Sequence, residues 1–265
     1  VCGAKCVFRP GRPEDYISKQ ASVNYMPELT EDSDRVVKYM KILKEFFHYP
    51  DYIHYQNKLN AAALYARNLA KIFPVETGSG NNGKSIWGKL KASCWGTYCI
   101  TIPAVALSEQ KRGSNSANPA TIRMEGTRIV LAQEIDDDRP MKKSFIKEQS
   151  GGDKIYQRTL YSEGGDTYPT SIIYLQCNRV PSFENADDAI IQRTRILPFG
   201  SKFEKDAPDS YEEQQRTRHY KPDKKIEEKL SYIAPAMLWC AVKYWPFFIN
   251  EDVNPPKSVL EYTDK

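Results

Sequence analysis

The stretch ETGSGNNGKSIW, residues 76–87, decides how the rest of the chain is interpreted. Its spacing Gly78-x4-Gly83-Lys84-Ser85 fits the phosphate-binding loop pattern G-x-x-x-x-G-K-[ST]. In that pattern the glycines let successive backbone N–H groups point inward, the lysine reaches the β- and γ-phosphates, and the serine hydroxyl ligates Mg²⁺. An apolar run (72–75) precedes the loop and a plausible helix (86–95) follows it, which is the required context. The sequence therefore predicts a nucleotide site formed by Gly78, Ser79, Gly80, Asn81, Asn82, Gly83, Lys84 and Ser85.

Composition narrows the class of protein without deciding it. A chain of 265 residues can bury a large core, either as one large domain or as a domain with an appendage. No run of about eighteen or more apolar residues occurs, so we expect no membrane-spanning segment. The net charge of +4 and the pI near 8.6 are compatible with nucleic acid but do not by themselves indicate it.

The first residues and the cysteines indicate whether the chain is a fragment and in which compartment it is found. It opens with VCGAKC, without an initiator Met or an apolar secretory segment, so we interpret it as an excised fragment of a longer protein. Its 6 cysteines are scattered, which favours reduced thiols in a cytosolic-type compartment. The pair Cys2-x3-Cys6 could instead be half of a zinc site with further ligands upstream, although the 3 histidines offer no completing pattern.

The hydrophobic pattern divides the chain into three parts. Residues 1–70 form a lead-in segment with turns and then two helical stretches, one starting at Ser33 and one over 52–70. Residues 71–200 alternate apolar runs (98–105, 128–133, 171–177 and 194–199) with amphipathic stretches, which predicts an α/β core with a parallel sheet covered by helices. Residues 201–265 combine a charged, aperiodic excursion (201–223) with a helix over 226–245, whose Trp239, Tyr244 and Trp245 we expect to pack in the core. Pro74 is unexpected in a central strand, because it removes one donor from the hydrogen-bond ladder.

Acidic residues follow the apolar run at 128–133, in the stretch TRIVLAQEIDDD. The end of such a strand is a usual place for a carboxylate that organises Mg²⁺, and Glu134 is the candidate. Hydrolysis also needs a polarised water, for which Asp136 and Asp137 compete. At least one acid of the run 136–138 is expected only to solvate a loop or cap a helix.

Two further segments supply an amide and arginines. The stretch SIIYLQCN is an apolar strand that ends in Asn178, which could hold the attacking water or a γ-phosphate oxygen. The stretch ADDAIIQRTRILPF places Arg193 and Arg195 beside another apolar strand. An arginine that reaches a neighbour's γ-phosphate can raise the rate by orders of magnitude. Only one of the two arginines can have that role, and the other is expected to be structural.

The segment between Glu134 and Asn178 contains two glycine pairs, 151–152 and 164–165, which bracket an alternating stretch. This pattern indicates a hairpin inserted between the two catalytic strands. Its Lys154 and Arg158 could follow a phosphate backbone. Alternatively, the hairpin packs on its own domain and Arg158 pairs with Asp153 or Glu163.

The order of these parts resembles superfamily 3 helicases. The resemblance rests on GSGNNGKS, Glu134, Lys147 with GGDKIYQR, Asn178 in CNRVP and Arg193 in QRTRILPF, and GRPEDYISKQASVNYMPE is similar to what precedes the motor. Within that superfamily, the sequence most resembles the primase-helicases of poxviruses, asfarviruses and other large cytoplasmic DNA viruses, which have relatives in phages. The resemblance covers nearly the whole chain, and the combination Lys…GGD-x-I-x-x-R with N-x-x-P is its specific part.

The resemblance implies an AAA+-type ATPase that assembles as a ring, usually a hexamer, around one strand of single-stranded or forked DNA. ATP would bind with Mg²⁺ between subunits, with Lys84 and Ser85 on phosphate and metal, Glu134 as the motor acid and Asn178 as the sensor. Arg193 would act on the neighbour's nucleotide. Lys147, Lys154 and Arg158 fall in the hairpin motif, which would face the central channel. A host-cytoplasmic site of viral replication and an upstream primase module in the full-length protein are also implied.

The sequence departs from the family in two places. The hairpin tip reads LYSEG at 160–164, where related helicases carry a lysine, so DNA contact is expected from Lys154, Arg158 or backbone groups. Ile135 follows Glu134 instead of a second acid, which leaves the water-activating carboxylate open.

Two other classes of function compete with the helicase interpretation. One is a different phosphate-loop NTPase, such as a small-molecule kinase or a nucleotide-dependent switch, although no N-K-x-D guanine-reading motif occurs. The other is a scaffold that keeps a nucleotide only for assembly, which the joint presence of Glu134, Asn178 and Arg193 argues against.

Overall fold

The computed structural model describes residues 7–108, 119–133, 140–157, 165–183, 187–251 and 253–263. A 5-stranded sheet lies at the centre, with the strand order β2-β3-β6-β1-β7 and parallel pairing throughout. The strands are β1 (Phe73–Thr77), β2 (Cys99–Pro103), β3 (Ile129–Gln133), β6 (Ile172–Cys177) and β7 (Thr194–Pro198). This sheet confirms the predicted α/β class and each of the apolar runs that were assigned to strands.

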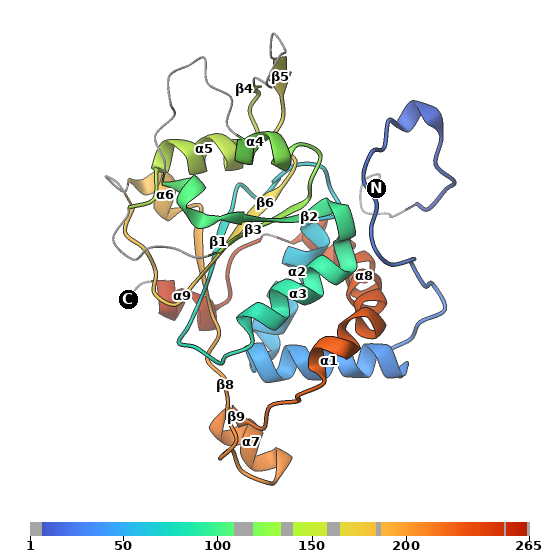
Figure 1. Cartoon of the computed structure of the whole chain (residues 1–265), viewed down its shortest axis with the longest axis vertical. Helices are drawn as coiled ribbons and strands as arrows, with labels where there is room; N and C mark the ends of the chain where they lie inside the picture. Colours follow the sequence, from blue (N-terminus) through green and yellow to red (C-terminus); the bar gives the residue numbers. More distant parts are fainter. Residues whose placement is uncertain are drawn as a thin grey trace.

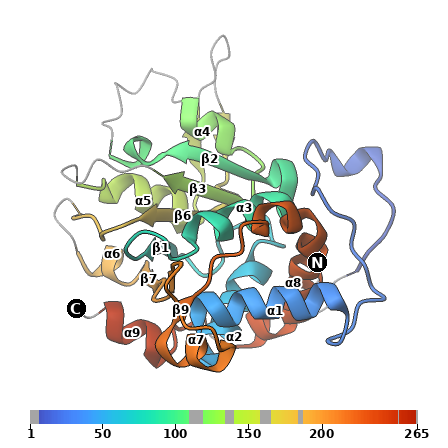
Figure 2. The ribbon, with the colours of Figure 1, turned by 60° about the horizontal axis from the view of Figure 1, so that its bottom comes forward.

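Helices cover both faces of the sheet (Figures 1 and 2). One face packs against α1 (Asp34–Phe47), α2 (Pro50–Ala62), α3 (Lys84–Trp95) and α8 (Ile226–Asn250). The other face packs against α4 (Pro119–Met124), α5 (Lys143–Gly151) and α6 (Asp188–Ile191). Consecutive strand residues alternate between the two cores, as Leu131 and Ala132 do, because side chains of a strand point to opposite faces.

The remaining regular elements are short. Single turns of 3-10 helix occur at η1 (Pro13–Asp15), η2 (Gly96–Tyr98) and η3 (Ala104–Leu107). The helix α9 (Lys257–Thr263) lies beside β7.

Within the described ranges, no helix has both the length and the apolar character needed to cross a membrane. The cysteines of those ranges are buried and form no disulfide with one another: Cys94, Cys99, Cys177 and Cys240.

Pro74 lies in β1 without costing a ladder hydrogen bond. In a parallel strand, alternate residues direct their N–H groups to opposite neighbours, and the Phe73 N–H donates to the Arg193 carbonyl on the β7 side. The nitrogen of Pro74 therefore faces β6, whose pairing with β1 begins only at Val75. The N–H group that Pro74 lacks would therefore point to a part of β6 that is not paired with β1.

The helix predicted over 52–70 is shorter than expected. It ends at Ala62, and Asn68 then holds the turn that leads into β1: its side chain bonds the N–H and the carbonyl of Ile72 at 3.1 and 2.7 Å. At the other end of the chain the prediction of core packing is confirmed, since Trp245 is buried and Trp239 and Tyr244 pack against the same core.

The charged segment 201–223 is more regular than its sequence predicts. It contains β8 (Lys202–Phe203), α7 (Tyr211–Thr217) and β9 (His219–Tyr220), and the two short strands pair in parallel. Tyr220 is buried and stacks on Phe203 with 5.5 Å between the ring centroids. Strands of 2 residues have no readable periodicity, which explains why the sequence predicts an irregular excursion here.

A hairpin is inserted between β3 and β6, as the sequence predicts. Its strands are β4 (Ile155–Gln157) and β5 (Gly165–Thr167), which pair antiparallel. The hairpin projects from one end of the molecule, and α7 with β8 and β9 projects from the opposite end (Figure 1).

Candidate active site

The segment from Gly78 to Ser85 connects β1 to α3, so the loop follows the carboxyl end of a central strand. Gly78 has φ +147°, and a Cβ atom there would lie 2.5 Å from Asn82 Nδ2 and 2.6 Å from the Phe199 carbonyl oxygen. Gly83 has φ +91°, and a Cβ atom there would lie 2.5 Å from the Phe46 ring. The two glycines of the motif are therefore required both by backbone conformation and by close packing.

Lys84 is held inside this loop by neutral oxygens. The residue is 8% exposed, and its ammonium donates to the Gly78 carbonyl, to Asn82 Oδ1 at 3.3 Å and to Asn178 Oδ1 at 3.4 Å. Burial lowers the pKa of Lys84. No carboxylate of the described residues lies within ion-pair distance of this ammonium. Among the described residues, the hydrogen-bond partners of this ammonium are neutral oxygens, which orient its positive charge in the loop where an anion could bind.

Asn178 reaches the loop from the neighbouring strand. It follows β6, which pairs with β1, and the Thr77 hydroxyl donates to the Asn178 carbonyl at 3.3 Å. The contact between Asn178 and Lys84 brings together two residues that the sequence analysis selected from segments almost a hundred positions apart.

Ser85 lies in the first turn of α3, after Gly83 as the N-cap residue. It is exposed and lines a cavity of about 1030 Å³ beside the loop. The Lys84 N–H, the first of this helix, donates to Asn82 Oδ1 at 3.3 Å. The helix dipole adds to the positive potential at the loop. Ser85 is thus placed where a hydroxyl could ligate a metal ion bound to an anion in the loop.

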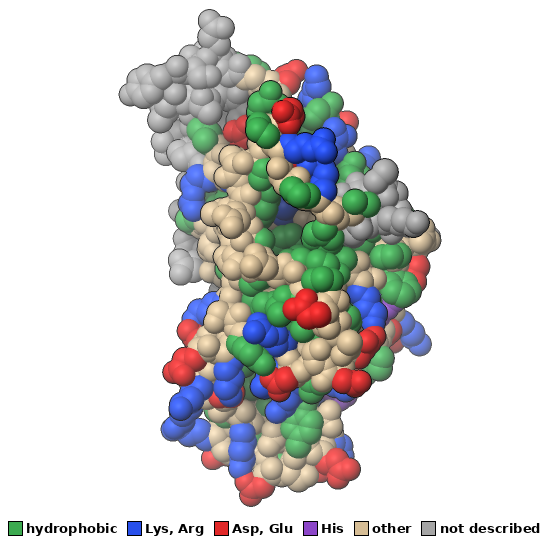
Figure 3. All heavy atoms as spheres, turned by 90° about the vertical axis from the view of Figure 1, so that its right-hand side faces the viewer, with side chains coloured by type: hydrophobic (Ala, Val, Ile, Leu, Met, Phe, Trp, Pro, Cys, Tyr) green, Lys and Arg blue, Asp and Glu red, His purple; other side chains and the backbone are tan. Residues whose placement is uncertain are grey.

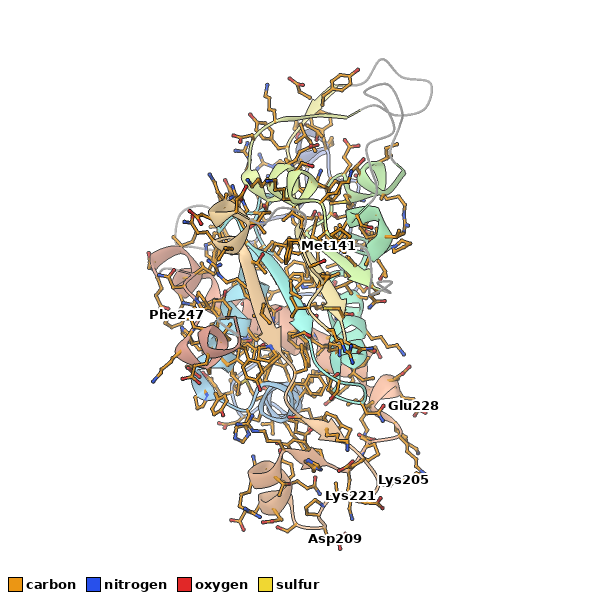
Figure 4. The ribbon with its side chains drawn as sticks, turned by 90° about the vertical axis from the view of Figure 1, so that its left-hand side faces the viewer. Met141, Lys205, Asp209, Lys221, Glu228 and Phe247 are labelled. Atoms are coloured by element: carbon orange, nitrogen blue, oxygen red, sulfur yellow. The ribbon has the colours of Figure 1, made fainter. Side chains whose placement is uncertain are left out.

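The cavity is large enough to hold more than a phosphate group. Its walls come from α1, the phosphate loop, the segment from Phe203 to Asp206, α7 and the start of α8. Apolar side chains (Ile42, Phe46, Phe203, Ile226) and lysines (Lys41, Lys229) line it together. Figure 4 shows Lys205 and Lys221, which also line the cavity, on the excursion at the end of the molecule. Four acids line it as well: Glu45, Glu204, Asp206 and Asp223. The apolar part of this wall, next to a phosphate loop, suits the base and sugar of a nucleotide.

The predicted acids Glu134, Asp136 and Asp137 lie outside the described residues, so their roles stay predictions. The strand β3 ends at Gln133, immediately before Glu134 in the chain, and pairs with β6.

The two arginines differ in their surroundings. Arg193 precedes β7, its guanidinium donates to the Ala189 carbonyl at 2.8 Å, and its own carbonyl accepts from the N–H at the start of β1. Arg193 is therefore at the amino edge of the sheet, opposite the edge that carries the phosphate loop. The Arg195 guanidinium donates to the carbonyl oxygens of Gln192 at 2.6 Å and of Thr194 at 3.0 Å. Arg195 thus has an evident structural contact.

The three predicted DNA-contacting residues do not share one element. Lys147 lies on α5 and not on the hairpin, and its ammonium donates to Asp187 Oδ2 at 2.6 Å. This contact holds the pKa of Asp187 at about 2 and ties α5 to the N-cap residue of α6. Lys154 directly precedes β4, is exposed, and lies 4.0 Å from Asp166 Oδ2. Arg158 and its predicted partner Glu163 lie outside the described residues.

Sequence reasoning missed two buried charges beneath the loop. Glu76 of β1 and Lys91 of α3 are both 0% exposed and form an ion pair at 2.5 Å. One signal was available, since Glu76 is a charged residue that directly follows a buried apolar run.

The sequence matches no protein-family model. It is 29% identical over 244 residues to "Putative helicase 184R" of Invertebrate iridescent virus 6, which covers 89% of this chain and 25% of that protein. It is 30% identical over 211 residues to "Putative helicase 022R" of Frog virus 3 (isolate Goorha), with 77% and 22% covered. "Putative helicase L207/L206" of Acanthamoeba polyphaga mimivirus is 28% identical over 260 residues, with 97% and 27% covered.

The chain thus spans about a quarter of the length of these relatives, which are all named helicases of large DNA viruses. Each of the three is named "Putative helicase".

Solved structures show the same fold. The apo structure of the NrS-1 C-terminal region has a TM-score of 0.62 at 13% identity and covers 91% of this chain and 55% of that one. A second apo form has a TM-score of 0.59 at 14% identity, with 92% and 55% covered. At this identity the likeness establishes the fold and not the activity.

Proposed function

We propose that this chain is the motor of a DNA helicase of superfamily 3 type, which uses ATP to translocate on single-stranded DNA during viral genome replication. The observation that carries the proposal is the buried ammonium of Lys84, which the Gly78 carbonyl and the side-chain amides of Asn82 and Asn178 orient beside a cavity of about 1030 Å³. The names of its viral relatives, each "Putative helicase", support a helicase activity among the many activities that use such a loop.

In this proposal, ATP and Mg²⁺ bind at the phosphate loop. Lys84 and the loop N–H groups bind the phosphates, Ser85 and Glu134 hold the metal ion, and Asp136 or Asp137 orients the attacking water. When bound, Mg²⁺ neutralises charge that develops on the phosphate oxygens. Asn178 acts as the sensor, because an amide that already contacts Lys84 is within reach of a γ-phosphate in the same loop.

We further propose a ring of identical subunits, a hexamer, in which Arg193 completes the neighbour's site. Arg193 precedes β7 at the amino edge of the sheet, whereas the phosphate loop follows the carboxyl end of β1. A guanidinium at the far edge from its own loop is suited to a site on the next subunit. One copy alone would then bind nucleotide but hydrolyse it slowly.

DNA is proposed to contact the hairpin through Lys154 and Arg158. The hairpin stands at one end of the molecule (Figure 1), and Lys154 at its base is exposed. Charged side chains of both signs gather over the lower part of the face in Figure 3, so that part of this face offers no uniform basic track for DNA. Lys147, held by Asp187, contributes by keeping α5 in place and carries less of the DNA contact. The setting would be a viral replication site in the host cytoplasm, with a primase module upstream in the full-length protein.

Unwinding of forked DNA tests this proposal directly. We expect strand displacement that requires ATP and Mg²⁺ and that is abolished by Lys84→Ala. Robust ATP hydrolysis without any unwinding and without stimulation by DNA would overturn the helicase proposal in favour of another phosphate-loop NTPase.

A further inference from the structure

Four polar side chains form a continuous chain of contacts beneath the phosphate loop. The Lys91 ammonium bonds Glu76 Oε1 at 2.5 Å, and the Gln176 amide donates to Glu76 Oε2 at 2.6 Å. The Gln133 amide in turn donates to Gln176 Oε1 at 2.5 Å. These residues come from α3, β1, β6 and β3 respectively, so one network joins the helix of the phosphate loop to three adjacent strands.

The network lies in the interior, where charge is costly. Glu76 and Lys91 are 0% exposed and Gln176 is 7% exposed. The Lys91 ammonium also lies 3.5 Å from the centroid of the Tyr174 ring, which stabilises a desolvated cation. A buried ion pair is often no more stabilising than apolar residues of the same volume. Stability alone therefore does not account for two charges at this position.

The positions of the four residues along the chain indicate what the network does. Glu76 is two residues before Gly78, Gln176 is two residues before Asn178, and Gln133 directly precedes Glu134. Lys91 lies two turns along the helix that Lys84 begins, and the Gln176 amide is 3.3 Å from the Lys84 carbonyl oxygen. Three members thus lie within two residues of the phosphate loop or of a proposed functional residue, and the fourth, Lys91, lies on the helix that Lys84 begins.

Gly88 of α3 leaves room for this arrangement. A Cβ atom at Gly88 would lie 3.2 Å from both polar atoms of the Gln176 amide. Glycine inside a helix costs roughly 1 kcal/mol relative to alanine. Gly88 thus lowers the stability of α3 slightly but lets the helix pack closely against the Gln176 amide.

We infer that the network Gln133–Gln176–Glu76–Lys91 positions the phosphate loop relative to the carboxyl ends of β3 and β6, so that Lys84, Glu134 and Asn178 act on one nucleotide. This inference rests on the proposed function. The four residues are positioning residues, since they act through the loop and the strand ends and do not touch the nucleotide. Their loss should lower turnover more than nucleotide affinity, because the loop itself remains.

The double variant Glu76→Gln/Lys91→Met tests this inference, since it removes both charges and nearly conserves volume. We expect the nucleotide Kd, measured with a fluorescent ATP analogue, to change less than about threefold. We expect kcat per nucleotide-binding site to fall roughly tenfold to a hundredfold, as for a small misplacement of reacting groups. The matched control is Lys58→Met, because Lys58 is also buried and forms an ion pair with Glu251, away from the loop. It should keep the wild-type kcat.

The outcomes separate the two proposals. A double variant with wild-type kcat per site overturns the positioning role, as does an equal loss of kcat in Lys58→Met. If the double variant does not fold, Gln176→Met provides the same test without removing a charge. A wild-type chain that binds ATP but never hydrolyses it would overturn the proposed function, and the positioning role with it.

Discussion

Substitution by alanine should destabilise the protein at Gly78 of the phosphate loop and have little effect at Gly80. Gly78→Ala places a side chain at φ +147°, with its Cβ atom 2.6 Å from the Phe199 carbonyl oxygen and 2.5 Å from Asn82 Nδ2. The Phe199 carbonyl is backbone and cannot move aside easily, since the Phe199 N–H is bonded to the Thr77 carbonyl at 2.8 Å. Gly80→Ala meets no atom within 4 Å and needs no positive φ.

The size of the effect follows from these contacts. A non-glycine residue in such a backbone conformation costs about 1–3 kcal/mol. Forcing a methyl group into a packed site costs about 1–3 kcal/mol more. For a domain of this size each kcal/mol lowers Tm by roughly 2–4 °C. Gly78→Ala should therefore lower Tm by roughly 5–20 °C, whereas Gly80→Ala should stay within about 0.5 kcal/mol of wild type.

Thermal unfolding followed by circular dichroism, together with binding of a fluorescent ATP analogue, measures both effects. Gly78→Ala should also weaken nucleotide binding at least about tenfold, because the clash displaces Asn82, which helps to hold Lys84. Equal melting and equal nucleotide affinity in Gly78→Ala and Gly80→Ala would refute the loop geometry.

Three further predictions follow from named contacts. Lys91→Met alone leaves the Glu76 carboxylate buried without its cation, so unfolding free energy should fall by about 3–5 kcal/mol, and adding Glu76→Gln should recover most of it in denaturant titrations. Lys147→Met should raise the pKa of Asp187 from about 2 toward its ordinary value in an NMR titration. Because that pKa is lowered in the folded state, the stability it contributes is present above about pH 4 and is lost as pH falls toward 2. This contribution should become smaller in the variant, in which the Ile190 N–H and Lys143 still contact Asp187. Arg193→Ala should keep nucleotide affinity and lose about a thousandfold in turnover. Rings mixed from Arg193→Ala and Lys84→Ala subunits should recover part of the activity, because one variant keeps the phosphate loop and the other keeps the arginine. No recovery in mixed rings would contradict a site shared between subunits.

The strands and the phosphate loop could be predicted because their signals are local. The strands β3 and β6 are largely buried apolar runs, and the loop glycines and Lys84 have a fixed spacing. The contact between Lys84 and Asn178 was also accessible, since strands of a parallel sheet end at the same edge.

The parts that the sequence did not reveal depend on distant pairing. Lys147 appeared to belong to the hairpin motif, but it lies on α5, and its partner Asp187, forty residues away, ties that helix to α6. Lys91 would ordinarily be assigned to a solvated face of its helix, and only the fold brings Glu76 against it. The elements of 201–223 are too short to produce a period, although the burial of Tyr220 organises them.

The central claim is that this chain couples ATP hydrolysis to single-stranded DNA. The most direct measurement is ATP turnover with and without single-stranded DNA, for wild type, Lys84→Ala and Arg158→Ala, with the mass of the assembly determined under the same conditions. The account predicts turnover that DNA stimulates in a hexamer, that Lys84→Ala abolishes, and that in Arg158→Ala no longer responds to DNA. Turnover indifferent to DNA in a fully formed ring would contradict it.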